Sequence, residues 1–127
     1  MASAVVSDNF ETGSGQVPQL GGTGATTCKA WVNFNSQGTV TINDSYNVAS
    51  ITDNGIGNYT INFTTTMGNN FYSVNGMCRG GNSTDQTMEV VGVSNGIGIT
   101  VASCNIRTSW YTNFYDPKQV YAQVFSN

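Results

Sequence analysis

The densest group of side chains that could make specific contacts lies near the C-terminus. Within six positions the chain carries four large aromatic residues, Trp110, Tyr111, Phe114 and Tyr115. Aromatic rings with amide side chains nearby suit the faces of sugars or the surfaces of other proteins. Large aromatic residues also bury most of their surface in a core or between subunits. The sequence therefore predicts a contact surface here and leaves open whether it meets another subunit, a ligand or the core.

Catalytic chemistry has little support in this sequence. The chain contains no histidine, the commonest group for proton transfer near neutral pH. Its seven acidic residues are scattered, and most lie in turn contexts, as Asp53 does before Asn54. Cys28 and Cys78 each stand beside a basic residue, but neither belongs to a recognisable catalytic triad. We therefore expect that the protein is not an enzyme.

Metal and cofactor sites are equally unsupported. Cys28, Cys78 and Cys104 lack the paired spacing of a structural zinc site, and no calcium-binding loop of alternating acids occurs. We expect no bound metal and no cofactor. An odd number of cysteines without CxxC spacing favours buried thiols, and one disulfide is the alternative.

The composition limits the architecture and the partners. A chain of 127 residues supports one core, and only 9% of these residues are charged, against about a quarter in an average soluble domain. The net charge of −3 does not favour nucleic acid as a partner. We expect no membrane insertion, because no run approaches the roughly 20 apolar residues of a membrane helix. The first ten residues lack the features of a signal peptide, so we expect synthesis in the cytoplasm.

The first 27 residues have the composition of an extended arm. Residues 13–27 contain five glycines and one proline. The arm also carries five apolar residues with no strand of their own to pack into, Val5, Val6, Phe10, Val17 and Leu20. Extended segments of this kind bind other chains by strand pairing or by docking in a groove. We therefore expect the arm to anchor the protein. The low charge of the protein, its aromatic residues and this arm also lead us to expect a homo-oligomer.

Residues 28–127 alternate between apolar and polar positions with period two, which is typical of short β-strands. The clearest example is residues 58–66, where Tyr59, Ile61 and Phe63 fall on one face. The candidate strands are residues 30–35, 39–43, 46–52, 58–66, 70–75, 87–94, 98–105 and 119–125. We expect an all-β domain, an antiparallel β-sandwich of seven or eight short strands preceded by the extended N-terminal arm.

The connections between the strands are also predicted. Asp53, Asn54 and Gly55 stand between two strand-like segments and indicate a hairpin. Residues 76–85 and 110–117 are predicted to be the two long excursions from the sandwich. Loops carry function more often than the strands that they connect, so a local function is expected in these two segments.

Three segments carry a resemblance to a known family. These segments read KAWVNFN at residues 29–35, QGTV at 37–40 and SITDNGIGNYTINF at 50–63. They resemble the β-structured domain of fibre and virion structural proteins from marine and cyanobacterial phages. The resemblance is dense over residues 29–63 and fades into a similar strand pattern towards residue 125.

This resemblance implies a stable β-fold on the virion surface, with oligomers that are often trimers. In fibre proteins the domain follows a long shaft, whereas about 27 residues precede it here. We therefore expect capsid decoration, with the arm bound to other virion proteins such as the major capsid protein. The alternative is a tail-fibre tip or receptor-binding module that adheres to host surface glycan or protein.

Overall fold

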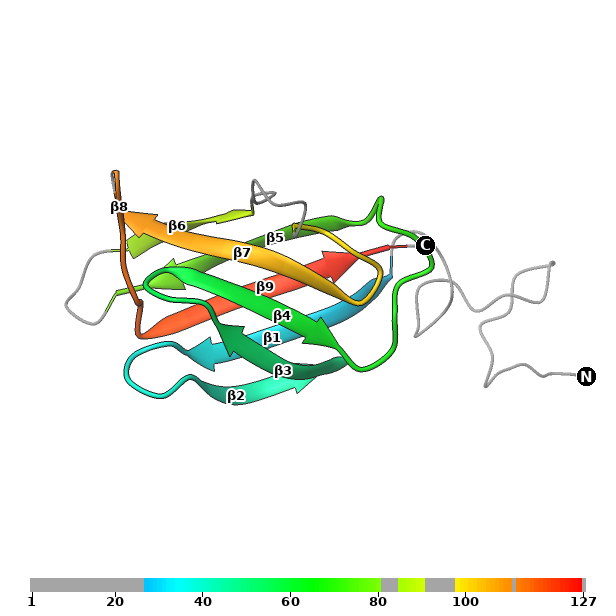
Figure 1. The fold of residues 1–127 in the computed structure, drawn as a ribbon, viewed down its shortest axis with the longest axis horizontal. Coiled ribbons are helices and arrows are strands. Elements are labelled where there is room, and N and C mark those ends of the chain that lie inside the picture. The colour runs from blue at the N-terminus through cyan, green and yellow to red at the C-terminus, as the bar shows by residue number, and fades with distance from the viewer. Residues whose placement is uncertain (1–26, 81–84, 91–97, 111, 127) are drawn as a thin grey trace, which may run out of the picture.

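The computed structural model describes residues 27–80, 85–90, 98–110 and 112–126, which form nine β-strands (Figure 1). The strands are β1 (Cys28–Asn35), β2 (Thr41–Tyr46), β3 (Val48–Asp53), β4 (Asn58–Phe63), β5 (Ser73–Arg79), β6 (Asp85–Val90), β7 (Ser103–Trp110), β8 (Asn113–Phe114) and β9 (Gln119–Phe125). Among these residues no helix has the length and the apolar character needed to cross a membrane.

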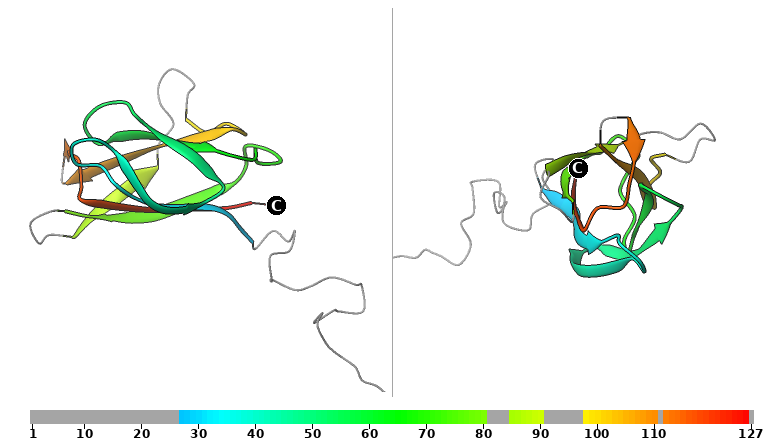
Figure 2. Two further views of the ribbon diagram at one scale, coloured as in Figure 1. Left: turned by 90° about the horizontal axis from the view of Figure 1, so that it is seen from below. Right: turned by 90° about the vertical axis from the view of Figure 1, so that its left-hand side faces the viewer.

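Eight of the strands form two four-stranded antiparallel sheets, in the orders β2-β1-β9-β5 and β6-β7-β4-β3. Strand β6 pairs with both β5 and β7 and joins the two sheets along one side, while the two-residue β8 pairs with β7. The views in Figure 2 show the sheets wrapped around a common interior. The predicted all-β antiparallel sandwich is therefore confirmed. Residues 1–26, most of the predicted arm, lie outside the described residues.

The core follows from the alternation of side chains along each strand. In β4, Tyr59, Ile61 and Phe63 are buried, as the pattern predicts. The Tyr59 ring meets the ring of Phe34 from β1 edge to face, with 5.3 Å between the ring centroids. Because β1 and β4 belong to different sheets, this contact ties the two layers together. Such pairs contribute about 1 kcal/mol beyond the apolar area that they bury.

A single residue, Asn47, carries the chain from one sheet to the other. It separates β2 from β3, which are the outermost strands of the two sheets. Its backbone has a φ of 56°, in the left-handed region that asparagine tolerates better than most residues. One left-handed residue thus turns an extended chain sharply enough to begin a strand in the second layer.

The predicted hairpin is confirmed, since β3 and β4 pair in antiparallel register around residues 54–57. The predicted excursion over residues 76–85 is wrong in its bounds. Strand β5 continues to Arg79 because all seven of its residues pair with β9, and β6 begins at Asp85. Glycine and polar residues marked this stretch as a loop, but the hydrogen bonds to β9 outweigh that local preference.

Two predicted strands have different bounds in the structure: one is shifted along the chain and one is shorter. The strand expected over residues 98–105 begins only at Ser103, because the Thr100 hydroxyl accepts a hydrogen bond from the Ser103 backbone N–H and holds a turn there. The strand expected over residues 58–66 ends at Phe63. The threonines that follow Phe63 line a pocket instead.

Candidate functional site

The predicted aromatic contact surface lies at one end of the sandwich, and the strand alternation divides it. Trp110 ends β7 and Phe114 belongs to β8, and their side chains are 48% and 45% exposed. Trp110 pairs with Asn113, and Ser109 pairs with Phe114. Since neighbouring residues of a strand point to opposite faces, Trp110 and Phe114 lie on opposite faces of this small ladder. Tyr111 lies outside the described residues.

The remaining member of the cluster, Tyr115, turns towards the interior. Its hydroxyl lies 3.4 Å from the Cys78 sulfur, and its carbonyl accepts a hydrogen bond of 2.7 Å from the Thr108 hydroxyl. Burial raises the pKa of the Tyr115 phenol, and the neighbouring Cys78 raises it further. Tyr115 therefore joins β5 to β7, while the side chains of Trp110 and Phe114 are about half exposed.

Two residues that the sequence analysis did not single out extend this end of the molecule. The Arg107 guanidinium lies over the Phe114 ring, with 4.8 Å from its central carbon to the ring centroid. Such a cation–π contact orients the ring and contributes about 0.5–1 kcal/mol at an exposed site. Ile56, at the turn of the β3–β4 hairpin, is exposed beside Gly57, whose backbone approaches Phe114 closely. We call Ile56, Trp110 and Phe114 the tip.

A partly buried polar network holds the tip on the sandwich. The Tyr59 hydroxyl donates a hydrogen bond of 2.5 Å to Asp116 Oδ1, and the Gly57 backbone N–H donates to the same oxygen over 2.9 Å. Beside them, the Ser36 hydroxyl donates to the Pro117 carbonyl over 2.6 Å. Burial and the bond to Asp116 raise the pKa of the Tyr59 phenol, which therefore stays protonated. The network fixes residues 115–117 to β1 and to the β3–β4 hairpin.

The opposite end carries the termini of the domain and a polar pocket. Cys28, the first residue of β1, pairs with Phe125, the last residue of β9. The described chain therefore enters and leaves the sandwich at the same end, which we call the base (Figure 1). The pocket at the base has a volume of about 510 Å³ and is lined by Lys29, Tyr46, Asn47, Thr64, Thr65, Thr66, Met67 and Gly68.

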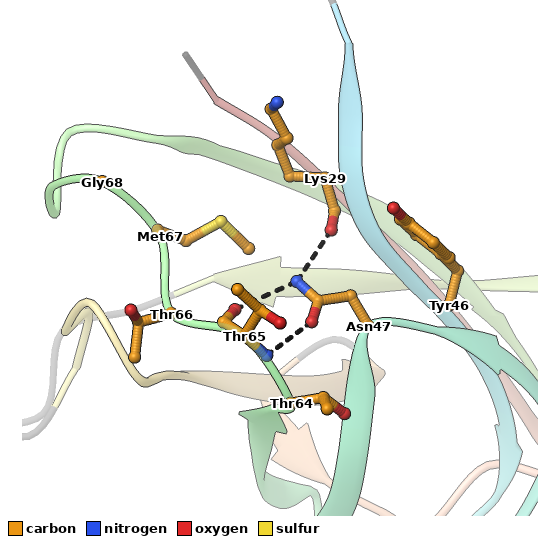
Figure 3. A pocket seen from close by; sticks show the side chains of 8 residues that line it. All are labelled: Lys29, Tyr46, Asn47, Thr64, Thr65, Thr66, Met67 and Gly68. Atoms are coloured by element: carbon orange, nitrogen blue, oxygen red, sulfur yellow. Dashed lines mark hydrogen bonds between the residues drawn. The ribbon is translucent and has the colours of Figure 1, made fainter. Parts of the chain in front are cut away.

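Asn47 organises this pocket (Figure 3). Its Nδ2 donates to the carbonyls of Lys29 at 3.0 Å and Thr65 at 3.1 Å, and its Oδ1 accepts from the Thr65 N–H at 2.6 Å. The Lys29 ammonium points away from the Asn47 amide in this view. Threonine hydroxyls and one ammonium suit a small polar ligand or a partner backbone, and these groups do not form a catalytic arrangement.

Two of the three cysteines, Cys78 and Cys104, have thiols that lose their proton less readily than an exposed thiol does. No disulfide joins any two of the three cysteines; Cys78 and Cys104 are buried, and Cys28 is half-buried. Burial raises the pKa of the Cys78 thiol and raises that of the Cys104 thiol to about 12. A thiol must lose its proton to act as a nucleophile, so these shifts work against catalysis. In the part of the chain that the structure describes, no three histidine, cysteine, aspartate or glutamate side chains converge on a metal position.

Comparison with protein-family models, with curated proteins and with solved structures finds no match to this chain. The phage resemblance of residues 29–63 therefore stays a prediction.

The predicted anchoring residues, Val5, Val6, Phe10, Val17 and Leu20, all lie outside the described residues. Their role, like the contact role of the tip, also stays a prediction. The exposure of Trp31, in contrast, could have been found from the sequence. Ala30, Val32 and Phe34 alternate with it, so the pattern places Trp31 on the outer face.

Proposed function

We propose that this chain is a non-enzymatic structural protein of a bacteriophage virion, displayed on the particle surface as a capsid decoration module. The observation that carries the proposal is that the two ends of the sandwich differ. The domain is joined to the preceding chain at the base, and its exposed tip residues lie at the far end. A module attached by its N-terminal arm would therefore project its tip away from the attachment point.

The chemistry of the described residues supports a structural role. The most perturbed ionisable groups are phenols and thiols whose pKa values are raised by burial, so they stay neutral at physiological pH. Enzymes tune such groups in the opposite direction when they use them as nucleophiles. The sequence also offers no histidine as a general base.

The partners follow from the two ends of the module. The apolar residues of the arm would bind other virion proteins, such as the major capsid protein, by strand pairing or groove docking. The protein would be a homo-oligomer, with a trimer favoured by the phage resemblance. Native mass spectrometry of the full chain tests the oligomer, and a monomer at micromolar concentration would count against it.

Removal of residues 1–24 tests the anchoring role. The truncated chain keeps every described strand, so we expect a normal circular dichroism spectrum and a cooperative thermal transition. We expect it not to load onto phage particles produced without the protein, whereas the full chain restores occupancy. Loading is measured by quantitative mass spectrometry of purified particles. A folded truncated chain that loads fully would place the anchor in the sandwich and overturn this part of the proposal.

The tip favours a second candidate function, a receptor-binding module on a tail fibre. Exposed aromatic side chains at the end farthest from the attachment point are placed to meet a host surface. Trp110→Ala would then lower adsorption to host cells without lowering occupancy on the particle. Immunogold labelling separates the two functions directly, because decoration gives label over the capsid and a receptor-binding module gives label at the tail.

A further inference from the structure

The outer face of the β2-β1-β9-β5 sheet presents a second set of aromatic and amide side chains, on strands other than β7 and β8, which carry Trp110 and Phe114. The antiparallel registers align one row of residues across all four strands, Tyr46, Trp31, Gln123 and Asn75. The neighbouring row consists of Asp44, Asn33, Tyr121 and Met77. Directly paired residues share a face with Cβ atoms about 5 Å apart, so the two rows form a continuous surface.

This surface is open and carries a shallow groove. Tyr46 is 57% exposed and Met77 is 62% exposed, and Trp31 is also exposed. The groove, along β5 and β9, has a volume of about 630 Å³ and includes Asn75, Met77 and Tyr121 in its lining. Four strands spaced about 4.8 Å apart give the face a width of roughly 14 Å. A ligand that spans it can contact several rings and amides at once.

The row that contains Trp31 also carries two side-chain amides, Gln123 and Asn75, that a ligand can reach. Among the described residues, no protein group hydrogen-bonds to the side-chain amides of Asn75 and Gln123. Each amide offers two N–H donors and one carbonyl acceptor. Tyr121 is held in place, because its hydroxyl donates to Gln119 over 2.8 Å. The face therefore combines aromatic rings, of which Tyr121 is held in place, with amides that have no hydrogen-bond partner among the described residues.

The geometry points to this outer face as a binding site for a neutral linear glycan. Sugar hydroxyls both donate and accept hydrogen bonds and so match amide side chains, and the C–H faces of a sugar ring pack on aromatic rings. The two rows contain one charged residue, Asp44, on the outermost strand β2. Arg79, at the end of β5, also lines the groove, so this face carries one charge of each sign and no net charge that would require an ionic ligand. A neutral ligand needs no ionic partner. This inference does not depend on the virion location.

The two tryptophans of the chain make the site testable by fluorescence. Trp110→Phe leaves Trp31 as the only tryptophan, on the proposed site, and Trp31→Phe leaves only Trp110, at the tip. Each full-length variant is titrated with cellohexaose, maltohexaose and laminarihexaose. We expect at least one of these neutral glycans to change the emission of the Trp110→Phe protein with saturation. We expect the emission of the Trp31→Phe protein to stay unchanged.

Affinity variants complete the test. Trp31→Ala and the double variant Asn75→Ala/Gln123→Ala should each weaken binding of the active glycan roughly tenfold or more, as loss of a central contact does. Trp110→Ala is the matched control and should bind normally. Thermal unfolding checks that each variant folds. We expect each to fold, because substitutions at exposed positions usually change stability little.

Three outcomes would overturn the inference. The first is no response to any of the three glycans. The second is a glycan response from Trp110 alone, which would place the site at the tip. The third is a change of oligomeric state in Trp31→Ala without any glycan binding by the parent protein, which would make the face a subunit interface. Particle loading of Trp31→Ala reports separately on the virion proposal, since a variant that cannot bind glycan can still load.

Discussion

The Tyr59 hydroxyl and Asp116 Oδ1, separated by 57 positions in the chain, are joined by a hydrogen bond of 2.5 Å. Tyr59 also packs on Phe34 in the core, so one side chain ties the two sheets together and holds the segment that follows β8. Asp116 receives the Gly57 N–H on the same oxygen, which brings the hairpin turn into the arrangement. The position of the tip therefore depends on a contact that begins in the core.

Tyr59→Phe removes the hydroxyl and leaves the ring in place. Because the acceptor is a carboxylate, we expect the free energy of unfolding to fall by about 2 kcal/mol. Tyr72→Phe is the matched control, since the Tyr72 hydroxyl donates to neutral backbone carbonyls of Thr100 and Ser103. Its loss should be smaller, about 1 kcal/mol. Urea denaturation measures both, and an equal or reversed order would show that the Asp116 contact is not special.

Asn47 combines a left-handed backbone with three side-chain hydrogen bonds, and two variants separate these contributions. Asn47→Gly keeps the backbone conformation accessible and removes the bonds, so we expect a loss of roughly 2 kcal/mol. Asn47→Ala adds the cost of a left-handed alanine, for a total of roughly 3 kcal/mol. Thermal denaturation followed by circular dichroism gives the comparison. If Asn47→Gly were as stable as the parent, the side-chain hydrogen bonds of Asn47 would contribute nothing to the stability of the turn between β2 and β3.

Gly57 is required both by its backbone conformation and by the space around it. Its φ is 64°, and a Cβ there would lie 2.5 Å from the Thr108 carbonyl oxygen and 2.9 Å from the Tyr115 nitrogen. Gly38 is the control, because its φ of 68° is nearly the same and a Cβ there would meet nothing within 4 Å.

Gly38→Ala should therefore cost only the conformational term, about 1–2 kcal/mol. Gly57→Ala should cost at least roughly 2 kcal/mol more, or prevent folding, because two backbone atoms must move. Soluble yield and the urea midpoint report the difference. Equal losses in the two variants would mean that the hairpin turn adjusts freely and that the tip is not held closely against it.

The fold could be predicted largely because its strands alternate clearly. In residues 58–63 every second side chain is apolar, and those residues point into the core, as the pattern requires. The turn at Asn47 from one sheet to the other could not be predicted in the same way, because one left-handed residue leaves the apolar alternation on either side intact. The extent of β5 depends on its pairing with β9, which lies 40 or more positions away, and no local signal carries that information.

The candidate site was harder to predict for a related reason. Four aromatic residues in a short segment indicate contacts, but which of them face solvent depends on the pairing of β7 with β8. That pairing sends Tyr115 towards Cys78 and leaves Trp110 and Phe114 exposed. The outer face was overlooked because its residues come from four strands. Only the sheet order places Trp31 of β1 between Tyr46 of β2 and Gln123 of β9.

The buried thiols predict a loss of stability at alkaline pH. The Cys104 thiol has a pKa near 9.0 in an unfolded chain and about 12 in the folded protein. Below about pH 9 both states hold the proton, and stability does not depend on this group. Above it the unfolded chain releases the proton while the folded chain keeps it. Stability should then fall with rising pH by about 1.4 kcal/mol per pH unit for this thiol.

Variants of the buried cysteines test whether their thiols cause this fall in stability with pH. Burial also raises the pKa of Cys78, and Tyr59 and Tyr72 act in the same direction above about pH 10, the ordinary phenol range. Cys104→Ala should flatten part of the fall between about pH 9 and 10, and Cys78→Ala/Cys104→Ala should remove it there. Both variants lose some stability at neutral pH through lost packing, so the slope and not the absolute value is compared. Urea denaturation across a pH series measures this slope. A double variant with the slope of the parent would show that other groups cause the loss of stability at alkaline pH.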